Sequence, residues 1–188
     1  VPGRIVSTRM HEALYDLPTV IRGVAPVLAA RPEAHLVIAG DGRLRSEVER
    51  LAAASLPAGR FEFSGRLEPE AMAALLGAAE VYVSASHSDS TSVSLLEAMA
   101  CGAVPVVSDL DGNREWVTEG DGARLFAAGD AAALARAIEA ALGDAAWRAA
   151  ARMRNAAVIA ARGDASANLA RIEALFESLG RSRSGRRG

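Results

Sequence analysis

Short apolar runs alternate with helix-like segments along most of this chain, and this alternation limits the folds it can adopt. Between the runs, apolar residues recur at the spacing of amphipathic helices, most clearly over 17–30. Strands separated by helices imply a parallel sheet with right-handed crossovers. The sequence therefore predicts an α/β fold with a Rossmann-like parallel sheet of about six strands flanked by helices. The expected strands are 4–8, 36–39, 61–63, 81–83, 104–107 and 123–126.

Beyond the last expected strand, the chain reads as helical over 130–142, 144–162 and 165–179. The last of these helices carries an apolar stripe. This stripe either packs on its own domain or, if a partner domain is missing, is partly exposed or bound to another copy of the chain. The end of the chain is polar and rich in arginine and glycine, which favours disorder. We interpret 1–180 as one domain and 181–188 as a disordered tail.

Composition excludes several classes of partner and site. The 188 residues carry a formal net charge of −2, which provides no general field for nucleic acid or for an anionic membrane. Cys101 is the single cysteine, expected to be a buried small side chain, and no Cys/His cluster has the spacing of a zinc site. We find no apolar run long enough to cross a bilayer, and one reduced thiol is compatible with a cytoplasmic protein. Because the chain enters a strand almost at once, we expect it to be a piece of a longer protein.

The segment DSTSVSLLE, from Asp89 to Glu97, follows the expected strand 81–83 and opens a helix. Ligands bind at the carboxyl ends of parallel strands, and the N–H groups of a helix start suit anions. If Ser90 or Thr91 caps this helix, its N–H groups can hold a diphosphate or a sugar oxygen. Asp89 and Glu97 lie too far apart to share a metal ion easily, but can bind hydroxyls at two ends of an extended ligand. The plainer alternative is an ordinary cap and a solvated Glu97, although apolar neighbours suggest that this carboxylate needs a partner.

With the following residues AMACGAVPVV, this segment resembles the E-x7-E signature of the retaining, GT-B-fold glycosyltransferases of family 4. Other segments follow the same plan in the same order, so the resemblance covers about 4–142. They are IVSTR (5–9), LVIAGDG (36–42), FEFSG (61–65), NREWV (113–117) and the expected closing strand at 122–126. An ordered set of this kind is far more specific than a single pair of acids.

The resemblance implies a role for each matching position. Glu97 matches the acid that binds the ribose of a nucleotide sugar, and Asp89 the acid that contacts the donor sugar near the reacting carbon. Arg9 matches the arginine that neutralises the leaving diphosphate. The remaining positions implied in donor binding are Ser90, Thr91, Ser92 and Val93 through their backbone N–H groups, Arg66 near the base, and Gly40 and Gly42 in the GDG segment.

The sequence departs from the family pattern at three places. The first acid is Asp89 rather than glutamate, and hydroxyl residues at 90–92 replace the usual glycines. Tyr15 stands where the family normally has a lysine, and the chain contains no lysine at all. Arg9 then either acts with the helix dipole alone or is joined by another arginine, such as Arg43. Tyr15 can stack or form a hydrogen bond there, and a packed surface tyrosine is the simpler reading.

The resemblance implies half of a GT-B fold, namely the donor-binding domain of a glycosyltransferase. It implies retaining transfer of a sugar from a nucleotide diphosphate, UDP- or GDP-linked, to an acceptor hydroxyl without a metal or other cofactor. The N-terminal acceptor domain is expected to be missing here, and with it any membrane contact, so the chain alone should bind without transferring. One alternative is a non-catalytic nucleotide-sugar-binding or regulatory module. A Rossmann-like oxidoreductase is disfavoured because no G-x-G-x-x-G follows the first expected strand.

Two histidines and one glutamate stay open as ligand contacts. His87 lies in the loop before Asp89, and His11 lies in the loop after Arg9. Both have a simpler interpretation, as an exposed loop residue for His87 and a loop residue facing away from the cleft for His11. Glu115 either supports its helix or contacts the ligand.

Overall fold

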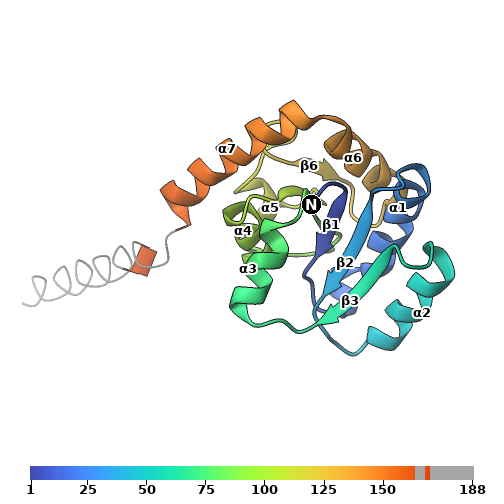
Figure 1. The fold of residues 1–188 in the computed structure, drawn as a ribbon. Helices are drawn as coiled ribbons and strands as arrows, with labels where there is room; N and C mark the ends of the chain where they lie inside the picture. The colour runs from blue at the N-terminus through green and yellow to red at the C-terminus, as the bar shows by residue number, and fades with distance from the viewer. Residues whose placement is uncertain (164–167, 170–188) are drawn as a thin grey trace, which may run out of the picture.

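The computed structural model describes residues 1–163, 168 and 169, and it contains a single six-stranded parallel sheet in that part of the chain. The strands lie in the order β3-β2-β1-β4-β5-β6, and Figure 1 shows β3, β2 and β1 side by side. They are β1 (Arg4–Ser7), β2 (His35–Ala39), β3 (Phe61–Gly65), β4 (Val81–Ser84), β5 (Val104–Ser108) and β6 (Arg124–Phe126). Each strand predicted from the sequence is present, so the predicted fold class is confirmed.

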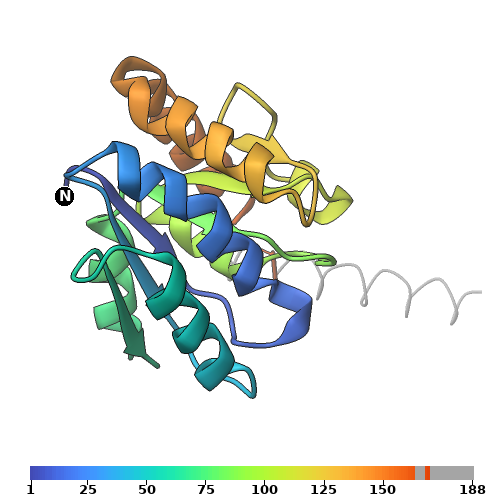
Figure 2. The same ribbon diagram turned by 90° about the vertical axis from the view of Figure 1, so that its right-hand side faces the viewer.

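Helices cover both faces of the sheet (Figures 1 and 2). One face is covered by α1 (Leu17–Ala30), α2 (Arg45–Ser55) and α6 (Ala131–Gly143), and α1 packs along α6. The other face is covered by α3 (Pro69–Gly77), α4 (Val93–Ala100) and α7 (Ala145–Arg162), where α4 packs on α7. Two short elements, η1 (Ala13–Tyr15) and α5 (Asp111–Arg114), lie in the loops after β1 and β5.

The strands supply both cores because successive side chains point to opposite faces. Ile5 belongs to the core under α1, α2 and α6, whereas its neighbour Val6 belongs to the core under α3 and α4. Both residues are fully buried, as expected for a parallel sheet covered on two sides. The apolar runs that predicted the strands are therefore a consequence of burial on two faces.

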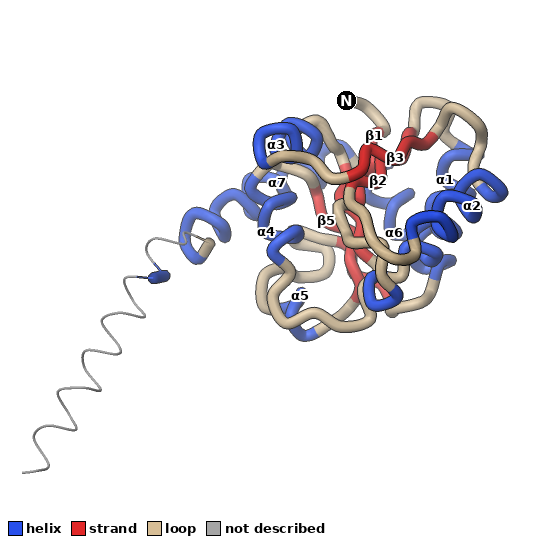
Figure 3. Tube along the Cα trace, turned by 90° about the horizontal axis from the view of Figure 1, so that it is seen from below, coloured by secondary structure: helices blue, strands red, loops and turns tan. Residues whose placement is uncertain are grey.

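The strand order reverses direction at β1, which pairs with β2 on one side and β4 on the other. At such a switch point the loops after the two central strands diverge and leave a crevice between them. Here these are the loops that follow β1 and β4, which carry Arg9 and Asp89. Strands β1 to β3 point downward in Figure 1, so Figure 3, seen from below, looks onto these loops.

Two predicted helices differ from the structure. The sequence also favours a short helix over 112–118, but the structure has only α5 at Asp111–Arg114. The side chain of Asn113 is held by the carbonyl of Ser108, and Val117 turns into the second core. The helix predicted at 165–179 lies outside the described residues apart from 168 and 169, as does the tail 181–188.

The segment Ala13–Ala30 is long and apolar enough to cross a membrane by length and composition alone, which corrects the expectation that no such run exists. In the structure this segment contains η1 and α1. One side of α1 is buried against the sheet and α6, including Val20, Ile21 and Val24. This is the environment of a core helix.

Candidate functional site

A pocket opens at the switch point between the loops after β1 and β4. Its volume is about 340 Å³, and most of its lining comes from 8–15 and from 89–97. The structure thus brings together the predicted pair of acids and the predicted arginine. The lining residues are Thr8, Arg9, Met10, Tyr15, Asp89, Thr91, Val93, Ser94 and Glu97.

Arg9 is the most constrained side chain of the pocket, with only 7% of its surface exposed. Its Nη1 donates to Ser92 Oγ at 2.8 Å and to Ser94 Oγ at 2.6 Å. Its Nη2 donates to Asp89 Oδ2 at 2.6 Å, a charge-assisted hydrogen bond. The ring of Tyr15 lies against the guanidinium, with 4.1 Å between Cζ and the ring centroid. The guanidinium is therefore fixed at two edges and on one face.

Ser94 links this cluster to the core of the sheet. The fully buried Tyr82 of β4 donates its hydroxyl proton to Ser94 Oγ at 2.9 Å. Neither Tyr82 nor Ser94 was among the residues predicted from the sequence. The only signal for Ser94 is a hydroxyl in the first turn of a helix that follows a site loop, and such residues are usually solvated.

The N-cap of α4 is Ser92, and the prediction of Ser90 or Thr91 as the cap is wrong. Ser92 is extended, and its Oγ accepts from the backbone N–H of Leu95 at 3.3 Å. Ser90 and Thr91 are exposed in the preceding loop. The shift leaves the N–H groups of Val93 and Ser94 as the unsatisfied first-turn donors beside the pocket.

Glu97 lies one to two turns further along α4 and is exposed. Its surroundings are partly apolar, as expected from its sequence neighbours, because it lines a pocket with Met72, Leu76 and Ala100, but its carboxylate is open to solvent. Within the described part of the chain its carboxylate has no hydrogen-bond or ion-pair partner. Glu97 thus differs from Asp89, whose charge is already paired with Arg9.

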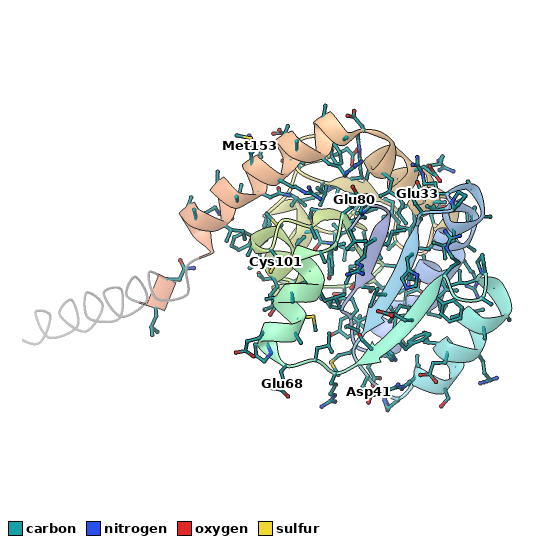
Figure 4. All side chains as sticks on the ribbon, in the orientation of Figure 1. Glu33, Asp41, Glu68, Glu80, Cys101 and Met153 are labelled. Carbon is teal, nitrogen blue, oxygen red and sulfur yellow. The ribbon has the colours of Figure 1, made fainter. Side chains whose placement is uncertain are left out.

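A second pocket of about 340 Å³ adjoins the first between α3 and α4, and Glu97 lines both. Apart from Glu97, its lining is mainly apolar: Leu67, Pro69, Met72, Ala73, Leu76, Ala100 and Cys101. Cys101, labelled in Figure 4, is half-buried rather than buried as expected. Burial, together with the negative charge of Glu97, raises the pKa of its thiol above the usual range. The thiol is therefore a poor nucleophile at neutral pH.

The predicted glycines support the loop of Arg9 and do not line either pocket. Gly40 has a φ of +119°, and a Cβ there would lie 2.8 Å from the carbonyl oxygen of Arg9. A Cβ on Gly42 would lie 2.5 Å from the carbonyl oxygen of His11. Asp41, between them, lies at the lower edge of the molecule in Figure 4. The GDG segment therefore acts through close backbone packing.

Gly112 supports the opposite side of the pocket. A Cβ on Gly112 would overlap the carbonyl oxygens of Asp89 and Ser90. The loop that carries Asp89 is thus held by direct packing on α5. Nothing in the sequence around Gly112 indicates this contact, because it depends on α5 meeting the loop of Asp89.

The remaining candidates lie outside the two pockets. His11 is buried, and neither ring nitrogen has a partner among the described residues; burial lowers the pKa of this imidazole. His87 pairs with Asp16, with 3.1 Å between Nε2 and Oδ2. Arg66 is exposed and precedes Leu67 of the apolar pocket.

Arg43, the alternative source of a second positive charge, is largely exposed. Its Nη2 lies 2.8 Å from Glu12 Oε2, and this pair lowers the pKa of the Glu12 carboxyl. Arg43 therefore does not reach Arg9 in this structure. Among 1–163, 168 and 169, no group of three or more His, Cys, Asp or Glu residues could hold a metal ion.

The sheet and the pocket at its switch point define a Rossmann-like α/β domain, and comparison with known proteins identifies the family. The model of the family "Glycosyl transferases group 1" matches residues 12–159. This chain belongs to that family and carries one half of a GT-B fold.

Two similar proteins are mannosyltransferases. Phosphatidyl-myo-inositol mannosyltransferase of Mycolicibacterium smegmatis is 35% identical over 131 residues, which are 66% of this chain and 33% of that protein. A GDP-mannose-dependent monoacylated alpha-(1-6)-phosphatidylinositol monomannoside mannosyltransferase of Corynebacterium glutamicum is 35% identical over 112 residues, or 55% and 29% of the two chains.

The fold also matches a solved structure, HepE of Anabaena in complex with UDP-glucose. The TM-score is 0.85 at 19% identity, and the match covers 94% of this chain and 49% of that one. The chain thus spans about a third of the length of the relatives named above and about half of this structure.

Proposed function

We propose that this chain is the donor-binding half of a retaining glycosyltransferase and that its two adjoining pockets hold one nucleoside diphosphate sugar. The observation that carries the proposal is the place of Glu97. It stands on the wall shared by a polar pocket and an apolar pocket, with its carboxylate exposed and without a partner in the described residues. A carboxylate between an anion site and an apolar slot suits the two hydroxyls of a ribose.

The polar pocket suits the diphosphate and the sugar. Arg9 and the first-turn N–H groups of α4 are donors for phosphate oxygens. Asp89 is an acceptor for the hydroxyls of the donor sugar. Asp89 now satisfies Arg9, so a bound diphosphate would replace one carboxylate contact of Arg9 by a phosphate contact.

The apolar pocket suits the base. Leu67, Met72 and Ala100 offer apolar surface, and the exposed Arg66 directly precedes Leu67 in the chain. The names of the similar mannosyltransferases favour a GDP-linked mannose as the first donor to test, whereas HepE was solved with UDP-glucose. The experiment therefore tests the identity of the base and the identity of the sugar separately.

The chemistry that this arrangement supports is sugar transfer without a cofactor. As the bond from the anomeric carbon to the diphosphate breaks, negative charge grows on the departing phosphate. Arg9 and the N-terminus of α4 stabilise that charge more in the transition state than in the ground state. We propose that a second domain supplies the acceptor and any membrane contact, and that transfer takes place in the cytoplasm.

Calorimetric titration of UDP, GDP, ADP and their sugars into the parent chain and into Glu97→Ala tests the proposal. We expect one nucleotide family to bind, and Glu97→Ala to weaken it by about tenfold or more, because charged hydrogen bonds to the ribose are lost. Glu47→Ala, which removes an exposed glutamate from α2 on the opposite face, is the matched control and should bind as the parent does. Absence of binding by every nucleotide would refute the proposal, and an equal response of Glu97→Ala would refute the ribose assignment.

The isolated chain should bind a donor and transfer nothing, since we propose that a second domain supplies the acceptor. A radiolabelled-donor assay with the longer protein and with this chain, at equal concentrations, checks this. Robust sugar transfer by the 188 residues alone would show that the acceptor site lies within them.

A further inference from the structure

Tyr15 occupies the position at which the family resemblance leads one to expect a lysine, and its ring covers one face of the Arg9 guanidinium. The distance from Arg9 Cζ to the ring centroid is 4.1 Å. Arg9 is the one basic side chain that lines the polar pocket in the described part of the chain. A diphosphate in this pocket therefore depends on a single arginine for side-chain charge.

A planar guanidinium recognises phosphate through its edges, while its face is free to stack on an aromatic ring. Ser92 and Ser94 already hold the Nη1 edge, and Asp89 holds Nη2. When a phosphate oxygen displaces Asp89, the ring of Tyr15 and the two serines remain. Contact at the face does not compete with the phosphate for hydrogen bonds.

The backbone around Tyr15 fixes the position of the ring. The N–H of Tyr15 donates to the carbonyl of Glu12 at 3.0 Å, and the carbonyl of Leu14 accepts from His87 N at 2.9 Å. The next residue, Asp16, has a φ of +42° and caps α1 by accepting from Thr19 N. Tyr15 is thus held between the loop of Arg9, the loop of Asp89 and the start of α1.

We propose that Tyr15 is a positioning residue: its ring keeps the Arg9 guanidinium aimed at the diphosphate and so takes over part of the role of a second cation. This inference rests on the proposed function, because it needs a diphosphate at Arg9. Tyr15 acts through its ring and not through its hydroxyl, which forms no hydrogen bond among the described residues. Phenylalanine should therefore replace it, whereas an aliphatic residue should not.

The experiment compares nucleoside monophosphate with diphosphate, using GMP with GDP and UMP with UDP, by calorimetry on the full chain. The Kd of the monophosphate divided by the Kd of the diphosphate measures the contribution of the second phosphate, which we place at Arg9. We expect Tyr15→Leu to lower this ratio by about fivefold to tenfold, in line with the strength of a largely desolvated cation–π contact. Monophosphate binding should stay within about twofold of the parent, because ribose and base lie at Glu97 and beyond.

Two further variants separate positioning from general loss of structure. Tyr15→Phe keeps the ring and should retain the ratio of the parent. Trp147→Leu removes another aromatic ring under an arginine, where Arg124 Cζ lies 4.3 Å from the ring centroid, and neither residue lines the pocket. This variant should lower the melting temperature and leave the ratio unchanged.

The outcomes are distinguishable. If the parent binds no diphosphate, the proposed function fails and this inference fails with it. If the parent shows the expected ratio and Tyr15→Leu shows the same ratio, only the role of Tyr15 is refuted. An equal loss of monophosphate and diphosphate binding in Tyr15→Leu also refutes it, because a merely structural role would have that effect.

Discussion

The two ends of the candidate donor site differ in how far the protein has organised them without a ligand. At one end, Arg9 is almost buried and makes hydrogen bonds to Asp89, Ser92 and Ser94. At the other end, Glu97 is exposed and has no partner among the described residues. The fold holds the Arg9 guanidinium in place, whereas the carboxylate of Glu97, the proposed ribose ligand, is exposed to solvent.

This difference follows from the cost of burying charge. The arginine lies deep at the switch point, where an unpaired charge is expensive, so the surrounding loops supply acceptors and an aromatic ring. Glu97 lies on the outer side of α4, where water satisfies its carboxylate. We therefore expect Arg9 to contribute to stability as well as to the proposed binding, and Glu97 to contribute to the proposed binding alone.

Arg9→Ala should give the largest effect and tests this separation directly. Removing the guanidinium leaves Asp89 with a mostly buried charge, so we expect a loss of about 3 kcal/mol of unfolding free energy. For a domain of this size, that corresponds to a melting temperature about 6–12 °C lower. Urea unfolding of Arg9→Ala, Glu97→Ala and the parent measures it.

Glu97→Ala is the matched control, and its stability should lie within about 0.5 kcal/mol of the parent. If Arg9→Ala is as stable as Glu97→Ala, the contacts of Arg9 contribute little, and the contrast between the two ends is wrong.

The sequence predicted the fold well because the signal for each strand is local. The run Leu36-Val37-Ile38-Ala39 is buried on both faces of the sheet. A short continuous apolar run of this kind is typical of a strand in a parallel sheet that helices cover on both sides. The bounds were less accurate where tertiary contacts decide them, as at α5, where one hydrogen bond from Asn113 to Ser108 anchors the chain.

Within the candidate site, the acids and Arg9 could be predicted from spacing and from resemblance, but their present contacts could not. Nothing in the sequence indicates that Arg9 and Asp89 pair with each other, since they are eighty residues apart. Ser94 and Tyr82 were missed for the same reason: their roles depend on β1, β4 and α4 meeting at one edge. The proposed binding roles of Ser90, Thr91 and Arg66 stay predictions.

Asp89→Asn should have a smaller effect than Arg9→Ala. It should act in opposite directions on the binding of nucleoside diphosphates and on the preference for nucleotide sugars. Asp89 competes with the diphosphate for Nη2 of Arg9, so loss of its charge should strengthen diphosphate binding by about threefold. The same change should reduce the preference for the nucleotide sugar over the nucleotide, because Asp89 is the proposed acceptor for sugar hydroxyls. Calorimetry with GDP, UDP and their sugars gives both values.

Asp109→Asn is the control for Asp89→Asn, because Asp109 forms an exposed ion pair with Arg114 near the same edge. It should change neither affinity. A weaker diphosphate complex in Asp89→Asn would mean that Asp89 orients Arg9 for the phosphate instead of competing for it.

His11 provides a pH-dependent test of the loop that carries Arg9. Burial lowers the pKa of His11 below its usual 6.5, so the unfolded chain binds more protons than the folded chain as the pH falls through that value. Stability should therefore decrease below about pH 6.5, at no more than about 1.4 kcal/mol per pH unit from this residue. His11→Phe, whose ring can keep the edge contact with Phe63, should show a shallower decrease between about pH 7.5 and pH 5. Parallel curves for the parent and the variant would show that His11 is solvated or partnered in solution.

Cys101 offers the smallest effect, and it reports on the apolar side of Glu97. Burial and the charge of Glu97 raise the pKa of the thiol, so its alkylation by iodoacetamide at mildly alkaline pH should be slower than that of a free thiol. Glu97→Gln removes the negative charge, which lowers the thiol pKa and should speed alkylation by about twofold. A nucleotide whose base fills the pocket between α3 and α4 should slow alkylation in the parent, because Cys101 lines that pocket. Full reactivity of Cys101 at saturating nucleotide would place the base elsewhere, and Glu97 would then belong to the polar end of the site alone.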